Sequence, residues 1–136
     1  MADQEAVWAE TTDGGLLKQL FGYYPTLHDA VLLSINIDRA ADSVEIVVDY
    51  NDMLGDDHTQ HLSVRIRLEW HGIDSMDLPL DCRDFYDLQF SRKGHQILTT
   101  IGTDSGQISV VSDSVEAILV RLDPGDHDDG PQLRYR

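Results

Sequence analysis

The sequence predicts an α+β fold that is mostly β. We expect one short N-terminal helix and an antiparallel sheet of about seven strands, curled or doubled on itself. Three observations lead to this prediction. From residue 31 onward, short runs alternate between apolar and polar residues, turn-forming residues separate the runs, and no helical pattern lies between them as in a βαβ fold. A chain of 136 residues suits a single domain.

The expected helix begins near residue 13 and ends at Phe21. In "GGLLKQLF" the apolar residues recur at helical spacing, which places them on one face. Gly22 suits the C-terminal stop because glycine readily adopts the left-handed conformation, and Pro25 prevents the helix from continuing. Residues 1–12 are acidic and weakly patterned, so we expect a flexible N-terminus before a domain spanning residues 13–122.

The expected strands follow one another with short turns between them. In the first, Val31, Leu33, Ile35 and Ile37 alternate with polar residues and are expected on one face. The clearest alternation is "HLSVRIRLEW", which is typical of a strand with one solvated face. The expected strands cover residues 31–38, 43–50, 61–70, 86–93, 96–102, 107–113 and 115–122. Residues 123–136 are rich in aspartate, proline and glycine, and we expect them to form a flexible acidic tail.

The charge of the chain restricts its partners. Asp and Glu number 25 against 10 Lys and Arg, which gives a formal net charge of −15. This balance argues against nucleic acid and against anionic membranes, both of which need clustered basic residues. A basic protein surface is the natural complement, although high solubility alone would also explain the charge.

Location and redox chemistry follow from simple features. The single cysteine, Cys82, excludes an intrachain disulfide. The first residues lack the pattern of a signal peptide, and no apolar run is long enough to span a bilayer. We therefore expect a cytoplasmic protein, and no motif predicts a cofactor.

Three short motifs invite a catalytic or metal-binding interpretation. His28 and Asp29 are adjacent, and neighbours in a strand point to opposite faces, so we expect them to have a structural role at the helix–strand junction. "GDDHTQH" offers His58 and His61 beside two aspartates, a weak signal for a divalent metal. "GTDSG" at residues 102–106 has the composition of a hairpin turn, and no histidine stands in the context that a serine nucleophile needs.

Acidic residues gather in two regions, the first expected hairpin with its following loop, and residues 74–87. Such dense like charge costs stability, which favours a use in binding a cationic partner. Tyr50 and Trp70 are aromatic anchors by type, but they lie on the inner faces of expected strands and are expected in the core. The residues expected to contact a partner are Asp49, Asp52, Asp56, Asp57, Asp77, Asp81, Asp84 and Tyr86.

Residues 21–37, "FGYYPTLHDAVLLSINI", carry a recognisable pattern. They resemble the opening signature of the immunity protein 50 family of bacterial polymorphic-toxin systems, in which Phe-Gly-x-x-Pro-x-x-His-Asp-Ala precedes a strand. The matching residues are Phe21, Gly22, Pro25, His28, Asp29 and Ala30. The later stretch "MDLPLDCRDFYDLQF" is similar to the second block of the family at Leu80, Phe85, Asp87 and Leu88, and "SVEAILV" to its closing strand.

This resemblance implies a cytoplasmic protein that binds a cognate toxin and blocks it by occlusion, with no enzymatic activity and no cofactor. Many such toxins are nucleases with basic clefts, which an acidic chain would complement. We expect a monomer or a weak dimer. Two alternatives remain open: a small metal-binding or hydrolase domain that uses His28, His58 and His61, and a structural protein that assembles with itself through an exposed strand edge.

Overall fold

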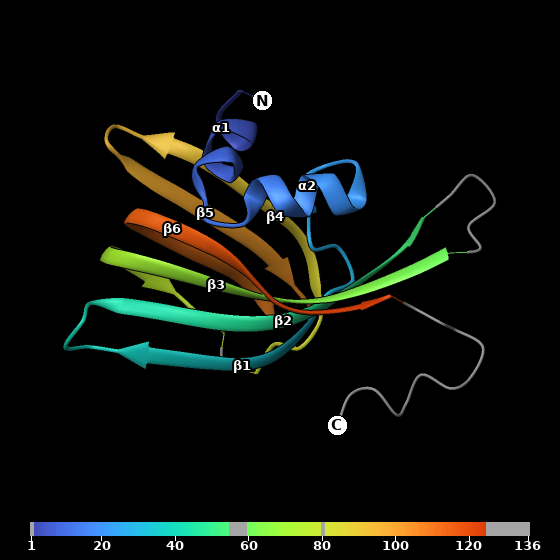
Figure 1. Cartoon of the computed structure of the whole chain (residues 1–136). Coiled ribbons are helices and arrows are strands. Elements are labelled where there is room, and N and C mark those ends of the chain that lie inside the picture. Colours follow the sequence, from blue (N-terminus) through green and yellow to red (C-terminus); the bar gives the residue numbers. More distant parts are fainter. Residues whose placement is uncertain (1, 55–59, 80, 125–136) are drawn as a thin grey trace.

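The computed structural model describes residues 2–54, 60–79 and 81–124 and confirms a mostly β, α+β fold (Figure 1). Two short helices precede a single antiparallel sheet with the strand order β1-β2-β3-β6-β5-β4. The helices are α1 (Ala2–Glu10) and α2 (Gly14–Phe21). The strands are β1 (Val31–Asp38), β2 (Ser43–Leu54), β3 (Gln60–Asp77), β4 (Phe85–Lys93), β5 (Gln96–Thr103) and β6 (Gly106–Pro124).

The described residues form six strands rather than about seven. The difference arises because the strands expected at 107–113 and 115–122 are one continuous strand, β6. The turn-like residues at 112–114 do not reverse the chain. They lie inside β6, which continues in register with β3 through the pair His71↔Ser114. At the same level, β3 bends at Gly72, whose φ is +69°, and a register shift follows between Ile73 and Ser75. The two long strands therefore bend together, and polar residues that resemble a turn serve a bend instead.

The sheet curls, as the sequence predicts, but it is not closed. Its first and last strands approach each other at one isolated antiparallel bridge, between Val31 in β1 and Asp84 just before β4. The two helices lie together along one face of the curled sheet, over β4, β5 and β6 (Figure 1).

One hydrophobic core lies between the helices and the inner face of the sheet. In β2 and β3 alternate residues are fully or almost fully buried, as the strict alternation of the sequence predicts. Trp70 has no exposed surface, and its Nε1–H donates to Thr99 Oγ1 over 2.9 Å. Tyr50 is also buried, so both aromatic residues belong to the core as expected.

The expectation of a flexible N-terminus is wrong for residues 2–10. They form α1, and the side chains of Val7 and Trp8 are completely buried in the core. The Trp8 ring stacks on Tyr24 with centroids 5.8 Å apart and meets Phe90 edge-on at 5.3 Å. This helix was not expected from the sequence, because two adjacent apolar residues make no periodic pattern. A helix this short is stabilised by packing rather than by the helix propensity of its residues.

The end of α2 confirms the role predicted for Gly22. This residue is left-handed, with φ +86°, and its N–H donates to Lys18 O over 2.8 Å. Phe21 and Pro25 are buried beside it. At the other end of the chain, the predicted tail begins too early, because residues 123 and 124 complete β6 and pair with β3.

The faces of β1 differ from the prediction. A bulge between Leu32 and Ser34 moves the alternation by one residue. Before it, Val31 lies opposite Asp49 on the outer face, and after it Ile35 and Ile37 lie opposite buried residues of β2. The apolar residues at 31, 33, 35 and 37 therefore do not share one face.

Candidate functional site

Two segments that the sequence analysis singled out lie side by side. Residues 26–32 run antiparallel to residues 83–88, outside the main sheet ladder. The Asp29 N–H donates to Phe85 O over 2.8 Å, and the Phe85 N–H donates to Ala30 O over 2.9 Å. Leu32 N–H likewise donates to Arg83 O over 2.9 Å. We call the outer surface along this contact the seam surface. It comprises His28, Asp29, Val31, Asp84, Tyr86, Asp87 and Asp104.

His28 fastens the turn before β1 to β4. Its Nδ1 lies 2.9 Å from Tyr86 O, and because a carbonyl only accepts, Nδ1 carries the donated proton. The same nitrogen is 3.2 Å from Asp87 Oδ1, and Nε2 is 3.8 Å from Asp29 Oδ1. The adjacent pair lies in a turn rather than in a strand, so the expectation of opposite faces is wrong. Asp29 itself has φ +69°, a left-handed conformation that aspartate tolerates better than most residues.

Asp104 joins the seam surface from the β5–β6 turn. Its Oδ1 accepts the backbone N–H of Arg83 over 2.9 Å and that of Asp84 over 3.3 Å. These bonds, that from Arg83 first, hold the pKa of Asp104 below its ordinary value. The residue was predicted only as part of a turn, and that turn is confirmed between Thr103 and Gly106. Its place beside residues 83 and 84 depends on the path of the chain from β3 to β4, which no local pattern encodes.

The centre of the seam surface is apolar and aromatic. Tyr86 is 47% exposed and Val31 is 37% exposed. The Tyr86 ring lies 6.4 Å from the His28 ring, and its Cβ packs over Gly102, where an added Cβ would lie 3.6 Å away. Four carboxylates belong to the seam surface, and those of Asp29, Asp84, Asp87 and Asp104 are all exposed. Exposed aromatic residues beside charged ones are common in protein–protein interfaces.

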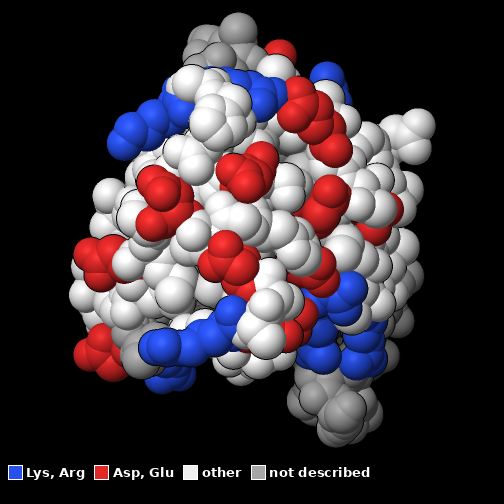
Figure 2. Space-filling model, turned by 90° about the vertical axis from the view of Figure 1, so that its left-hand side faces the viewer, with Lys and Arg blue, Asp and Glu red and all other residues white. Residues whose placement is uncertain are grey.

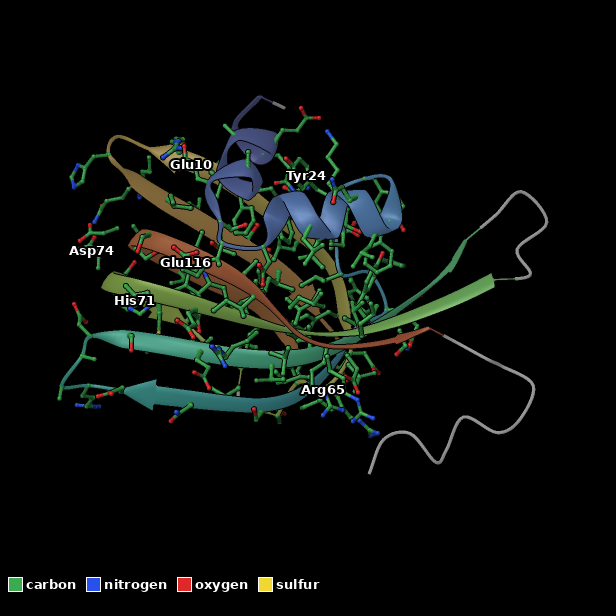
Figure 3. The ribbon with its side chains drawn as sticks, viewed as in Figure 1. Glu10, Tyr24, Arg65, His71, Asp74 and Glu116 are labelled. Atoms are coloured by element: carbon green, nitrogen blue, oxygen red, sulfur yellow. The ribbon has the colours of Figure 1, made fainter. Side chains whose placement is uncertain are left out.

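A row of cross-strand neighbours extends the seam surface over the outer face of the sheet. Val31 pairs with Asp49, Asp49 with Arg65, and Arg65 with Arg121. Asp49 accepts two hydrogen bonds from Arg65, of 2.8 and 3.2 Å. Figure 3 shows Arg65 on the face of the sheet opposite the helices. The Asp49 carboxylate therefore serves an internal ion pair beside the seam surface, and is less available to a partner than the sequence suggests.

The remaining predicted contact residues do not all meet. Asp84 and Tyr86 lie on the seam surface, and Asp81 is exposed in the segment that leads to it. Asp77 is exposed at the end of β3, opposite Ser109, in another part of the sheet. The side chain of Asp52 and the whole of Asp56 and Asp57 lie outside the described residues, as do His58 and the side chain of His61.

Catalytic and metal-binding interpretations find little support in the described part of the chain. Cys82 is buried, and burial, followed by the charge of Asp104, raises the pKa of its thiol, so it is a poor nucleophile at neutral pH. Within residues 2–54, 60–79 and 81–124, no group of three or more His, Cys, Asp or Glu side chains could hold a metal ion. Ser105 lies in the hairpin turn, where its backbone N–H donates to Thr103 Oγ1.

Comparisons with known proteins identify no relative. No protein-family model matches the chain, and neither the curated proteins nor the solved structures contain a match. The resemblance of residues 21–37 to the immunity protein 50 signature therefore stays a prediction. Among the helices that the structure describes, none is long and apolar enough to cross a membrane.

Proposed function

We propose that this protein is an immunity protein, which binds a cognate bacterial toxin through the seam surface and blocks it by occlusion. One observation carries the proposal. The seam surface combines two exposed side chains, Val31 and Tyr86, with four exposed carboxylates, of which Asp29 and Asp87 lie near His28 and Asp104 is attracted to Arg83. Such a surface is complementary to a basic protein surface with an apolar or aromatic pocket.

The resemblance and the charge also support this proposal. The motif of residues 21–37 and the second block around residues 80–88 provide the two segments that meet there. The net charge of −15 gives a long-range field that accelerates encounter with a cationic partner. A nuclease toxin with a basic cleft is the partner that this field fits best.

The binding energy is expected to be divided unequally over the seam surface. A central tyrosine that becomes buried typically contributes at least about 2 kcal/mol to affinity, whereas an exposed rim charge contributes about 0.2–1 kcal/mol. Occlusion needs no chemistry from the inhibitor, because a tightly bound surface that covers a cleft excludes substrate.

The test is a pull-down from the native host at low salt, eluted by a salt gradient and identified by mass spectrometry. We expect one stoichiometric partner that is toxic to cells and is released as salt rises. Tyr86→Ala is then expected to raise the Kd for this partner about thirtyfold or more, which corresponds to about 2 kcal/mol.

Leu16→Ala is the matched control, since Leu16 is an apolar side chain of similar exposure, 42%, on α2 outside the seam surface. The proposal fails if Tyr86→Ala binds as tightly as the control, or if the captured partner is indifferent to salt. Loss of growth protection by Tyr86→Ala in cells that express the toxin would connect binding to neutralisation.

A further inference from the structure

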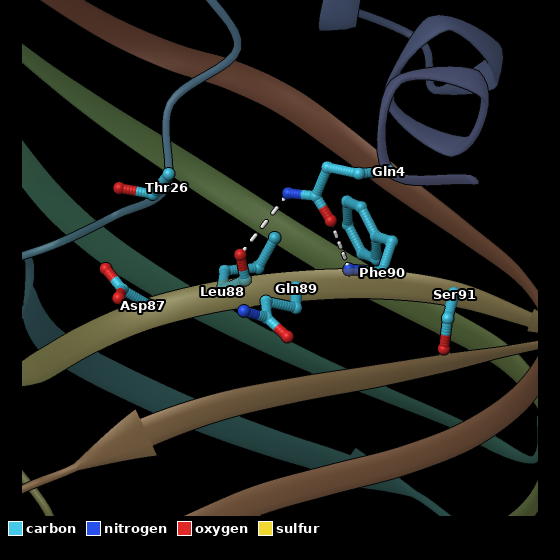
Figure 4. Close-up of a pocket in the computed structure, with 7 residues that line it drawn as sticks. All are labelled: Gln4, Thr26, Asp87, Leu88, Gln89, Phe90 and Ser91. Carbon is cyan, nitrogen blue, oxygen red and sulfur yellow. Dashed lines mark hydrogen bonds between the residues drawn. The ribbon is translucent and has the colours of Figure 1, made fainter. Parts of the chain in front are cut away.

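The edge of β4 is capped by a side chain from α1. Gln4 Oε1 accepts the Phe90 N–H over 2.5 Å, and Gln4 Nε2 donates to Leu88 O over 3.3 Å (Figure 4). An amide side chain thus takes the place of a neighbouring strand. The Leu88 N–H is satisfied as well, because it donates to Thr26 O over 2.7 Å. Another chain could not pair with this part of the edge without displacing these groups.

The edge of β6 beyond residue 113 is capped in a similar way. Here β5 no longer accompanies β6, and the segment between the helices takes its place. The Asp13 N–H donates to Ala117 O over 2.9 Å, and Asp13 Oδ2 accepts the Leu119 N–H over 2.7 Å. Thr12 also contacts Glu116. Both edges under the helices are therefore closed by specific polar groups.

Two other strand segments have a neighbour on one side only among the described residues. Beyond Leu32, β1 pairs with β2 alone, and residues 73–77 of β3 pair with β6 alone. Ordinary proteins protect such edges, since unpaired backbone groups invite another strand. The absence of a cap on the described parts of these two segments contrasts with the caps on β4 and β6.

The two open segments line one groove. It has a volume of about 600 Å³ and lies between the β1–β2 hairpin and the bent end of β3. Its apolar lining comes from Ile37, Val44, Ile73 and Met76, of which Ile37 and Met76 are 44% and 40% exposed. A strand that paired with β1 would direct alternate side chains into this lining.

The charges around the groove select the occupant. Asp38 and Asp42 belong to its lining, with Arg39 as the cation among the lining residues. Asp74 and Asp77 are exposed on the β3 segment. Figure 2 views this end of the molecule and shows carboxylates spread between uncharged side chains, with Lys and Arg nearer the margins. Figure 3 places Asp74 and His71 at the same end.

We propose that the groove binds an extended segment of a protein partner, with alternating apolar and basic residues, by strand addition to β1. Backbone hydrogen bonds to residues 33–38 provide affinity, and the apolar lining and the aspartates select the sequence. A second copy of this chain fits less well, because two acidic edges of a chain with net charge −15 would repel each other. This site is separate from the seam surface and does not depend on the proposed toxin.

The probe is a synthetic capped peptide of alternating lysine and valine, titrated into the isotope-labelled full chain and followed by backbone NMR. We expect chemical-shift changes confined to residues 33–38 and 73–77 and their strand neighbours, with slower amide hydrogen exchange in β1. The double variant Asp38→Asn/Asp42→Asn should raise the Kd about three- to tenfold, as expected for two exposed ion pairs. Asparagine keeps the acceptor that Asp38 offers to the Ala41 N–H and tolerates the positive φ of Asp42.

Two controls make the test decisive. Asp81→Asn/Asp84→Asn removes the same charge near the seam surface and should leave the Kd for the peptide unchanged. A peptide of alternating glutamate and valine should not bind. The proposal is overturned if the acidic peptide binds equally well, if the shifts lie on the seam surface or on β4, or if no binding occurs. It is also overturned if light scattering shows a dimer whose β1 amides are protected without peptide, since a second copy would then be the occupant.

Discussion

Trp8→Ala is the substitution that most directly tests how the N-terminal segment contributes to the fold. Trp8 is completely buried, stacked on Tyr24 and edge-on to Phe90. Removal of a buried tryptophan generally costs about 3–5 kcal/mol, because contacts are lost and a cavity remains. One feature reduces this cost. Trp8 Nε1 is buried without a hydrogen-bond partner among the described residues, and removing such a donor recovers about 1–3 kcal/mol.

The expected net loss is therefore about 2 kcal/mol of unfolding free energy, the difference between the midpoints of the two ranges. For a domain of this size, that corresponds to a fall in Tm of about 7 °C. Urea unfolding followed by far-UV circular dichroism measures the change without relying on tryptophan fluorescence. Trp8→Phe keeps an aromatic ring and removes the unsatisfied donor, so we expect it to change stability by less than about 1 kcal/mol.

Glu5→Ala on the exposed face of the same helix is the matched control and should lie within about 0.5 kcal/mol of the parent chain. A loss of unfolding free energy below about 1 kcal/mol for Trp8→Ala would refute the reasoning, because removal of a tryptophan packed in the core costs more than that. In that case α1 would not be packed on β4, and the expectation of a flexible N-terminus would stand.

Three further predictions concern the bend, the turn at β5 and the seam. Gly72→Ala should destabilise the fold by about 2–3 kcal/mol in urea unfolding, because φ is +69° and a Cβ would overlap the Asp113 carboxylate. Gly94 has φ +67°, but a Cβ added there would meet no atom within 4 Å, so Gly94→Ala introduces backbone strain without steric overlap. An equal loss of stability for Gly72→Ala and Gly94→Ala would show that the overlap with Asp113 costs nothing. The pKa of Asp104 is lower in the folded chain than its ordinary 3.8, so its stabilisation is complete above that pH and is lost as the pH falls through the folded pKa. Asp104→Asn should therefore flatten the pH dependence of unfolding below about pH 4, and an unchanged slope would contradict this cause. His28→Ala removes a hydrogen bond whose donor side chain is 56% exposed. We therefore expect thermal unfolding to show a loss of about 0.5–1.5 kcal/mol of unfolding free energy, and a loss above about 3 kcal/mol would mean that the imidazole does more than fasten the turn.

Local patterns in the sequence predicted most elements because the physics behind them is local. Alternation in β2 and β3 follows from one buried face, and the stop at Gly22 follows from the conformation that glycine permits. The failures have equally physical causes. The bulge after Leu32, in the pairing of β1 with β2, exchanges the faces on which the later side chains of β1 lie. Where β3 bends at Gly72, the polar residues 112–114 continue β6 instead of forming a turn. Both depend on a partner strand that is distant in sequence.

The candidate site was predicted only in part, for a similar reason. Composition identified the acidic segments and Tyr86, but not which carboxylates would gather around the exposed centre. Asp49 lies next to that centre and yet pairs with Arg65, whereas Asp104 belongs to it through hydrogen bonds to residues 83 and 84. Which aspartates remain available to a partner is decided by tertiary contacts, and a count of charges along the chain cannot reveal it.

The first part of the motif, from Phe21 to Pro25, and the exposed residues of the seam surface have different physical tasks. Phe21 and Pro25 are buried, and Gly22 ends α2, so these residues fix where the turn before β1 lies. His28 then ties that turn to the backbone at Tyr86. A substitution in the buried motif should therefore reduce stability and binding together, whereas Tyr86→Ala should reduce binding alone. The same scaffold would then suit partners with different surfaces, since the buried positions that fix the turn differ from the exposed positions that a partner would touch.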